Sequence, residues 1–233
     1  MSKTVVITGA TKGIGRALAQ KFAAEGWCLA LCARTGSDLE QLAEELTNKA
    51  DKVFTMPCDV SKPEQIKQFG SRVLAELGTV DVLINNAGVF LPGQVYNEPE
   101  GTLEALIETN LYSAYHLTRV LAPVMIERKR GHIFNMCSVA SIKAYHNGGS
   151  YAISKFALLG FSKSLREELK DFNIRVTSLI PGATYTPSWH AANLPEERFM
   201  KAEDVAKLVW DVYNLSDNTV VEEVVLRPLL GDI

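Results

Sequence analysis

The sequence has few cysteines, no long apolar run and no strong excess of charge. In 233 residues, 24 lysines and arginines oppose 27 aspartates and glutamates, giving a formal net charge of −3. This weak acidity gives no electrostatic reason to expect nucleic acid or an anionic membrane as a partner, and we expect neither. No uninterrupted apolar run approaches the ~18 residues that a membrane-spanning helix needs. The first residues also lack the long apolar stretch of a secretory signal, so we expect a cytoplasmic protein.

Glycine and proline occur at ordinary frequency, which excludes a collagen-like or linker-dominated chain. With 16 glycines, 9 prolines and 47 % hydrophobic residues, the chain can bury a core and is too apolar to be disordered. The histidines are scattered, and no histidine or cysteine spacing is typical of a metal site, so we expect no metal. The four cysteines form no CxxC pair and are expected to be reduced and buried; they are Cys28, Cys32, Cys58 and Cys137.

Short apolar runs alternate with longer segments of helical periodicity. Residues 4–8 form a β-branched run that is typical of a strand buried on both faces. Ile14, Leu18 and Phe22 follow at intervals of four, which indicates one face of a helix. The segment Ser61-Lys62-Pro63-Glu64 predicts a capping box at the start of a later helix. The expected strands are 4–8, 28–32, 53–59, 80–84, 132–137, 174–180 and 220–226.

This alternation predicts an α/β fold. About six helices separate the expected strands. Two of them are long: residues 102–128, which can form one helix or two pieces, and residues 151–172. Such an order implies parallel βαβ units and one doubly wound seven-stranded parallel sheet with helices on both faces. No linker or repeat divides the chain, so we expect a single domain over residues 1–233. In such sheets ligands bind beyond the carboxyl ends of the strands, where the strand order reverses.

A glycine-rich turn lies between the first expected strand and the first expected helix. It reads Thr8-Gly9-Ala10-Thr11-Lys12-Gly13-Ile14-Gly15. Glycines allow a tight turn in which backbone amides approach a pyrophosphate, and the helix N-terminus adds partial positive charge. The spacing is GxxxGxG, not the GxGxxG of the general dinucleotide fingerprint. A purely structural turn is the alternative, but the position directly after a buried strand favours a nucleotide site.

The end of the second expected strand bears on the choice between NAD and NADP. A carboxylate there would accept the ribose 2′-hydroxyl of NAD, whereas an arginine would neutralise the 2′-phosphate of NADP. The strand ends in Arg34 without an acid, and Lys12 is a second cation, so we predict NADP(H). The alternative is that both are solvated surface charges. Asp59, after the third strand, can accept an adenine amino hydrogen, although an aspartate there is also typical of turns and helix caps.

Further motifs follow the later strands. They are Asn85-Asn86-Ala87-Gly88, Asn110, Ser138, Tyr151-Ala152-Ile153-Ser154-Lys155 and Pro181-Gly182-Ala183-Thr184-Tyr185-Thr186. With the glycine turn, this set resembles the short-chain dehydrogenase/reductase family in order and spacing over nearly the whole chain. The resemblance implies a single-domain Rossmann fold and hydride transfer between NAD(P)(H) and a carbonyl or alcohol.

The resemblance also implies a set of site residues. Asn110, Ser138, Tyr151 and Lys155 would be catalytic. The residues expected to bind the cofactor, from the resemblance and the arguments above, are Gly9, Thr11, Lys12, Gly13, Ile14, Gly15, Arg34, Asp59, Val60, Asn86, Ala87, Gly88, Tyr151, Lys155, Pro181, Gly182, Thr184 and Thr186.

Tyr151 and Lys155 stand four residues apart and so share a helix face. A tyrosine with the ordinary pKa of about 10 is a poor base at neutral pH, and we expect the nearby ammonium and a positive nicotinamide to lower that pKa. The resemblance then gives Tyr151 the proton transfer, Lys155 a bond to the nicotinamide ribose, Ser138 a hydrogen bond to the substrate oxygen and Asn110 a relay water. Taken singly, each has a structural alternative, such as a packed aromatic, a strand-end cap or a helix kink.

The substrate is expected to lie against the loop after the fourth strand, residues 139–149 and a lid at about 187–200. Their apolar and aromatic side chains suit a hydrophobic or flat carbonyl compound, unless they pack the lid or a subunit interface. The candidate lining residues are Phe90, Leu91, Ile142, Tyr145, His146, Tyr185 and Trp189.

Much of the central sequence looks like that of a 3-oxoacyl-(acyl carrier protein) reductase, but residues 220–228 lack the glycine-rich ending of those enzymes. That ending is closer to the sepiapterin reductase-like and broad carbonyl reductase branches. We therefore expect an NADPH-dependent carbonyl reductase. The alternatives are a 3-oxoacyl-(acyl carrier protein) reductase and, more remotely, a non-catalytic NADP-sensing protein. The family also implies a homodimer or homotetramer through helices 102–128 and 151–172.

Overall fold

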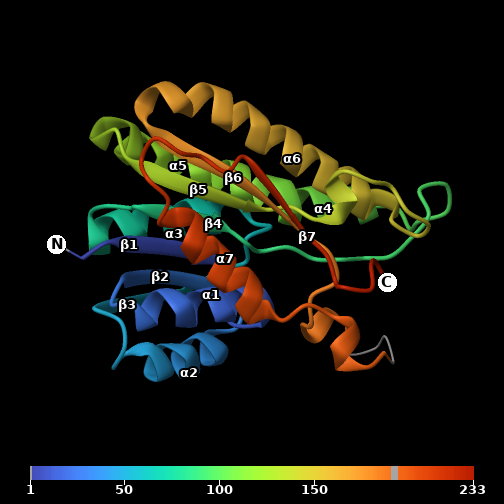
Figure 1. Ribbon diagram of the computed structural model, residues 1–233, viewed down its shortest axis with the longest axis horizontal. Coiled ribbons are helices and arrows are strands. Elements are labelled where there is room, and N and C mark those ends of the chain that lie inside the picture. The colour runs from blue at the N-terminus through green and yellow to red at the C-terminus, as the bar shows by residue number, and fades with distance from the viewer. Residues whose placement is uncertain (1, 190–193) are drawn as a thin grey trace.

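A parallel sheet of seven strands runs through the computed structural model, which describes residues 2–189 and 194–233. The strand order is β3-β2-β1-β4-β5-β6-β7, and each neighbouring pair is parallel. This confirms the predicted α/β fold with a doubly wound sheet (Figure 1). The strands are β1 (Thr4–Thr8), β2 (Cys28–Ala33), β3 (Lys52–Pro57), β4 (Val82–Asn85), β5 (Gly131–Met136), β6 (Ile174–Pro181) and β7 (Glu223–Leu226).

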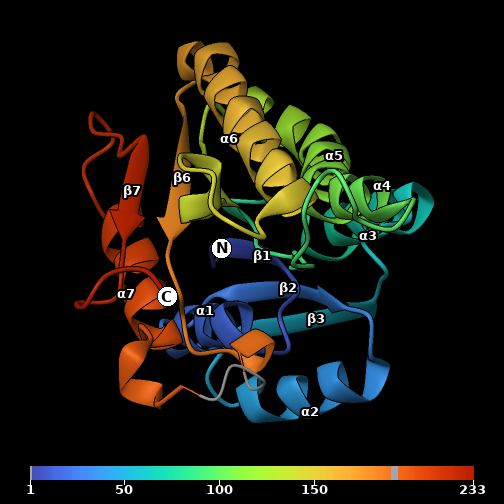
Figure 2. The ribbon, with the colours of Figure 1, turned by 90° about the vertical axis from the view of Figure 1, so that its right-hand side faces the viewer.

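Helices cover both faces of the sheet (Figure 2). Buried side chains of α1, α2 and α7 form one hydrophobic core with the strands, and those of α3, α5 and α6 form the other. Because both faces are covered, β1, β4 and β5 are buried at every residue, as their apolar runs predicted. The helices are α1 (Gly13–Ala24), α2 (Gly36–Leu46), α3 (Pro63–Leu77), α4 (Thr102–Ile107), α5 (Ser113–Arg128), α6 (Gly149–Leu169) and α7 (Ala202–Tyr213).

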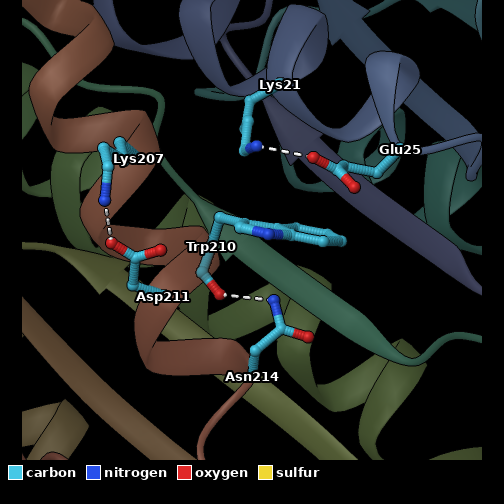
Figure 3. Close-up of polar contacts among 6 residues, drawn as sticks. All are labelled: Lys21, Glu25, Lys207, Trp210, Asp211 and Asn214. Atoms are coloured by element: carbon cyan, nitrogen blue, oxygen red, sulfur yellow. Dashed lines mark hydrogen bonds and ion pairs between the residues drawn. The ribbon is translucent and has the colours of Figure 1, made fainter.

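Aromatic side chains dock α7 onto α1. The ring centres of Phe22 and Trp210 lie 5.4 Å apart at an interplanar angle of 81°. Lys21 Nζ lies 5.0 Å from the centre of the Trp210 ring and 2.6 Å from Glu25 Oε1 (Figure 3). Edge-to-face ring pairs and a cation over an aromatic face each stabilise the packing, in addition to the stabilisation from buried apolar surface. This contact holds the C-terminal part of the chain against the first βα unit.

Several predicted strand boundaries differ from the structure. β3 ends at Pro57 instead of residue 59, β4 begins at Val82 instead of residue 80, and β7 begins at Glu223 instead of residue 220. Just before β7, the hydroxyl of Thr177 donates to the Val221 carbonyl at 2.6 Å. The expected capping box at Ser61 does not form. Its hydroxyl donates instead to Asp59 Oδ1 at 2.8 Å, and α3 begins at Pro63 without a side-chain cap.

Within residues 2–189 and 194–233, no helix combines the length and apolar character needed to cross a bilayer. The same ranges contain no group of three or more histidine, cysteine, aspartate or glutamate side chains that could hold a metal ion. All four cysteines are free thiols, with Cys28 partly exposed and the others buried.

Candidate active site

The glycine turn after β1 is packed so closely that glycine is required at several positions. Gly9 and Gly13 have φ values of +66° and +50°, in the left-handed region that favours glycine. A Cβ on Gly15 would collide with the Gly9 carbonyl oxygen and lie 2.6 Å from Asn86 Nδ2. The turn is therefore pressed against the end of β4, where the strand order reverses.

Asn86 joins the turn to β4 by hydrogen bonds. Its Nδ2 donates to the carbonyl oxygens of Thr8 and Gly9, at 2.9 and 3.2 Å. In return, Thr8 Oγ1 accepts from the backbone N–H groups of Asn86 and Ala87, at 3.1 and 3.0 Å. These bonds set the carboxyl ends of β1 and β4 side by side and so shape the floor of the crevice.

The N-terminus of α1 is open to an anion. Its N-cap residue, Lys12, has an extended backbone and makes no side-chain cap, so amides of the first turn keep their capacity to bind an anionic group. Lys12 Nζ lies 3.1 Å from Asp38 Oδ2. Arg34 is exposed and, within the described residues, has no carboxylate oxygen within 4.0 Å. A hollow of about 120 Å³ beside the turn is lined by Thr11, Lys12, Arg16, Asp38, Gln41 and Leu42.

Asp59 and Val60 are held by local contacts after β3. Asp59 Oδ1 accepts from the Ser61 backbone N–H at 3.0 Å and from the Ser61 hydroxyl at 2.8 Å. This is the turn-capping alternative raised by the sequence. Val60 is buried in the core beneath α3, so any contact with a ligand would come from its backbone. Neither observation tests a role in adenine binding, which stays a prediction.

The segment after β6 returns to the glycine turn. A Cβ on Gly13 would lie 2.7 Å from Thr186 Cγ2, so Thr186 packs directly on the turn. Gly182 N–H donates to the Leu226 carbonyl at 2.8 Å, which ties the end of β6 to β7. Thr184 is buried, and its hydroxyl donates to the Gly182 carbonyl at 3.2 Å. Residues 190–193 of the expected lid lie outside the described residues.

Ser138, Tyr151 and Lys155 meet beyond the carboxyl end of β5. Tyr151 lies in the first turn of α6 and is hydrogen-bonded to the hydroxyl of Ser138, which directly follows the strand region. Lys155 follows one helical turn later, with its Nζ 5.9 Å from the centre of the Tyr151 ring. The ammonium donates to the Met136 carbonyl at 2.8 Å. The structure therefore brings these three expected residues together.

Burial is the largest influence on the pKa values of Tyr151 and Lys155. It raises the pKa of Tyr151 to about 12, and the Ser138 hydrogen bond opposes that rise only in part. Burial also lowers the pKa of Lys155 to about 8. The expectation that the lysine lowers the pKa of Tyr151 is wrong for the protein groups alone, because burial raises this pKa and Lys155 is not among the groups that shift it. Tyr151 is thus a protonated phenol at neutral pH.

Asn110 connects the loop after β4 to α6. Its Oδ1 accepts from Val89 N–H at 2.8 Å, and its Nδ2 donates to the Val89 carbonyl at 3.0 Å and to Ser154 Oγ at 2.9 Å. It lies on a π-helical turn, Glu108–Tyr112, which joins α4 to α5. Single π turns inside helices often occur at functional sites. A Cβ on Gly88 would lie 3.2 Å from Asn110 Oδ1 and 3.4 Å from Lys155 Nζ.

The expected substrate-lining residues do not gather at one place. Tyr185 and Trp189 pack against Phe199, with ring centres 5.8 and 5.4 Å away. Phe90 packs edge-on against Tyr151, with ring centres 4.8 Å apart. Tyr145 and His146 instead line a cavity of about 620 Å³. That cavity reaches α6 on a different face from Tyr151, since its helical residues include Ala152, Ile153 and Phe156.

Two carboxylates near the site have no local sequence signal. Asp38 pairs with Lys12, and Glu98 accepts hydrogen bonds from the backbone and hydroxyl of Ser150. Glu98 and Ser150 are 52 residues apart in the chain. The sequence offers only indirect hints of this contact, in the glycines at positions 93 and 149.

Comparison with known proteins agrees with this geometry. The family model for short chain dehydrogenase matches residues 3–197. Over all of this chain and 99 % of the relative, the sequence is 35 % identical to a sepiapterin reductase of Chlorobaculum tepidum. It is 32 % identical to a 3-oxoacyl-[acyl-carrier-protein] reductase of Thermotoga maritima, over 89 % of this chain and 88 % of that one.

Solved structures show the same likeness. An alcohol dehydrogenase from the archaeon Thermococcus sibiricus, complexed with 5-hydroxy-NADP, superposes with a TM-score of 0.91 at 30 % identity, covering 99 % of this chain and 98 % of that one. A metagenomic short-chain oxidoreductase in complex with NADP gives 0.85 at 34 % identity, covering 98 % of each chain. The chain therefore belongs to the short chain dehydrogenase family of oxidoreductases.

Proposed function

We propose that the protein is an NADPH-dependent carbonyl reductase. The observation that carries this proposal is the meeting of Ser138, Tyr151 and Lys155 beyond β5, on the same edge of the sheet as the glycine turn. A hydroxyl, a protonated phenol and an ammonium at one place can bind a carbonyl oxygen and give it a proton.

The residues beside β1 and β2 fit a dinucleotide phosphate. This fit rests on the uncapped start of α1 and on the crowding that excludes any side chain at Gly15. Lys12 and Arg34 would hold a 2′-phosphate, and the turn would hold the pyrophosphate. The two solved relatives described above contain NADP or a derivative of it. This supports NADP(H) as the cofactor.

The protein groups divide the reaction between them. When bound, NADPH supplies a hydride to the carbonyl carbon of the substrate. Tyr151 Oη donates its proton to the carbonyl oxygen, so that the C=O group becomes CH–OH. Ser138 Oγ hydrogen-bonds the same oxygen and stabilises its developing negative charge. Lys155 stabilises the phenolate that remains after the transfer.

Turnover assays test this function. We expect the purified protein to consume NADPH, followed as loss of its absorbance, with at least one compound in a panel of diketones, quinones, pterins and β-ketoesters. A β-ketoacyl thioester of acyl carrier protein belongs in the panel, because a 32 % identical relative carries that activity in its name. Exclusive use of that thioester would favour the 3-oxoacyl reductase alternative. Binding of NADPH without any turnover would favour a sensor.

Arg34→Ala is expected to weaken NADPH binding about 10- to 100-fold and to leave NADH binding unchanged. The reason is the loss of one charge-assisted hydrogen bond to the 2′-phosphate, worth ~1.5–3 kcal/mol. Dissociation constants from fluorescence titration measure the effect. Arg130→Ala is the matched control, since Arg130 is also exposed but precedes β5 at the opposite edge of the sheet. A parallel loss of NADH affinity would argue against contact with the 2′-phosphate.

The rate of carbonyl reduction is expected to fall as pH rises through about 8. Lys155, whose pKa burial lowers to about 8, is charged below that pH and neutral above it, whereas Tyr151, with a pKa of about 12, stays protonated throughout. We therefore expect kcat/KM for NADPH, which reports the free protein, to be level near neutral pH and to fall about tenfold per pH unit well above 8. A pH–rate profile at saturating carbonyl substrate measures it. A kcat/KM that increases above neutral pH would contradict this assignment of charges.

The expectation of a homodimer or homotetramer stays a proposal. Several large apolar side chains on α4, α6 and the π turn are exposed in the single chain, and contact between copies would cover them. They are Leu103, Tyr112, Ile153 and Phe156.

A further inference from the structure

A carboxylate from a distant loop caps the helix that carries Tyr151. Glu98 Oε1 accepts from the Ser150 backbone N–H at 2.9 Å, and Glu98 Oε2 accepts from the Ser150 hydroxyl. Ser150 directly precedes Tyr151. The helix has no side-chain cap of its own, because its N-cap residue is Gly148. Glu98 thus supplies the acceptor and the negative charge that a helix N-terminus favours.

Glycines on both sides form a cradle for Glu98. A Cβ on Gly149 would collide with Glu98 Oε1, and a Cβ on Gly93 would lie 2.6 Å from Glu98 Cγ. Gly149 also has a φ of +41°. Gly93 forms a parallel bridge with Gly148, and its N–H donates to the Asn147 carbonyl at 3.0 Å. The carboxylate is therefore clamped between the loop after β4 and the start of α6.

The same loop touches Tyr151 itself. Phe90 packs on the Tyr151 ring, and Asn110 holds the neighbouring Val89 backbone by two hydrogen bonds. The loop is thus fixed near Lys155 at one end and at Ser150 at the other. Tyr151 lies between these points in the first turn of α6, where helices fray when their amides lack acceptors.

We propose that Glu98 is a positioning residue for Tyr151, acting through Ser150 and the first turn of α6. This inference rests on the proposed reductase function. Glu98 donates and accepts no proton in the reaction. It holds the phenol hydroxyl where it meets the carbonyl oxygen, and misplacement by about 1 Å can cost about 100-fold in rate.

Three variants test the proposal. We expect Glu98→Ala to lower kcat about 10- to 100-fold while the dissociation constant for NADPH stays within about twofold of wild type. Glu98→Gln should recover most of the rate, since its Oε1 can still accept from the Ser150 N–H. Glu100→Ala is the matched control, because Glu100 is exposed on the same loop and makes no hydrogen bond or ion pair with other described residues. It should match wild type.

The outcomes separate this proposal from the proposed function. If Glu98→Ala keeps the wild-type kcat while Tyr151→Phe is inactive, the positioning role is overturned and the reductase stands. A matched loss of NADPH affinity and kcat would also overturn it, as a general structural defect. If the wild-type protein reduces no carbonyl, the rate of backbone amide hydrogen exchange in residues 148–156 tests whether Glu98 caps α6. Faster exchange in Glu98→Ala than in Glu100→Ala supports the cap, and equal exchange overturns it.

Discussion

Tyr151→Phe is expected to reduce kcat for carbonyl reduction at least about 1,000-fold and to leave NADPH binding within about twofold of wild type. A positioned general acid contributes about 10²–10⁴-fold, and phenylalanine removes only the hydroxyl that carries the proton. The neighbouring Ser138 cannot replace it at neutral pH, because an aliphatic hydroxyl is a far weaker acid than a phenol. Initial rates of NADPH consumption and a fluorescence titration measure the two quantities.

The matched control for this substitution is Tyr115→Phe. Tyr115 lies on α5, is 36 % exposed, and its hydroxyl accepts from Arg119 Nη1 at 2.6 Å. Its loss should change neither kcat nor cofactor affinity. If Tyr151→Phe retained more than about a tenth of the wild-type rate, the proton would have to come from another group, and the proposed mechanism would be rejected. An equal loss of NADPH binding would instead place Tyr151 in cofactor binding alone.

The fold could be predicted because its signals are local. Runs such as residues 4–8 show burial on both faces, and the intervening helical periods require parallel crossovers. The parallel sheet with helices on both faces followed from those two facts, whereas the order of the strands in the sheet came from the structure. The start of β7 could not be predicted, because the apolar run begins at Val220 whereas the pairing with β6 begins only at Glu223.

The site was predictable to the extent that its residues are neighbours in sequence. The glycine turn and the pair Tyr151 and Lys155 each lie on one short segment, so their spacing indicates their geometry. Glu98 and Asp38 contact residues that lie far along the chain, and only the folded structure brings them together. The direction of the Tyr151 pKa was missed for a related reason. It depends on burial by surrounding segments more than on the lysine one turn away.

The raised pKa of Tyr151 agrees with the proposed role of its hydroxyl. A phenol with a pKa of about 12 holds its proton at neutral pH. Proton donation to a carbonyl oxygen needs this protonated form, whereas oxidation of an alcohol needs the phenolate.

Gly15→Ala is expected to lower the free energy of unfolding by ~2–4 kcal/mol and to weaken NADPH binding at least about tenfold. The new Cβ would collide with the Gly9 carbonyl and crowd Asn86 Nδ2 at 2.6 Å. Overpacking of this kind costs ~1–3 kcal/mol, and a weakened hydrogen bond of the half-buried Asn86 amide costs about 1 kcal/mol more. Because Gly9 and Asn86 shape the crevice floor, the cofactor site is distorted together with the fold. Urea unfolding and fluorescence titration measure the two effects.

Gly160→Ala is the matched control, since it makes the same substitution in a helix where a Cβ would meet no other atom within 4 Å. Alanine there should raise the free energy of unfolding by ~0.5–1 kcal/mol, because it restricts the unfolded chain and fits the helix. The contrast isolates the contact between the turn and β4 from the general effect of replacing glycine. If both variants were equally stable and bound NADPH equally well, Gly15 would not be a close-approach position. The cofactor site would then have to lie elsewhere on the sheet edge.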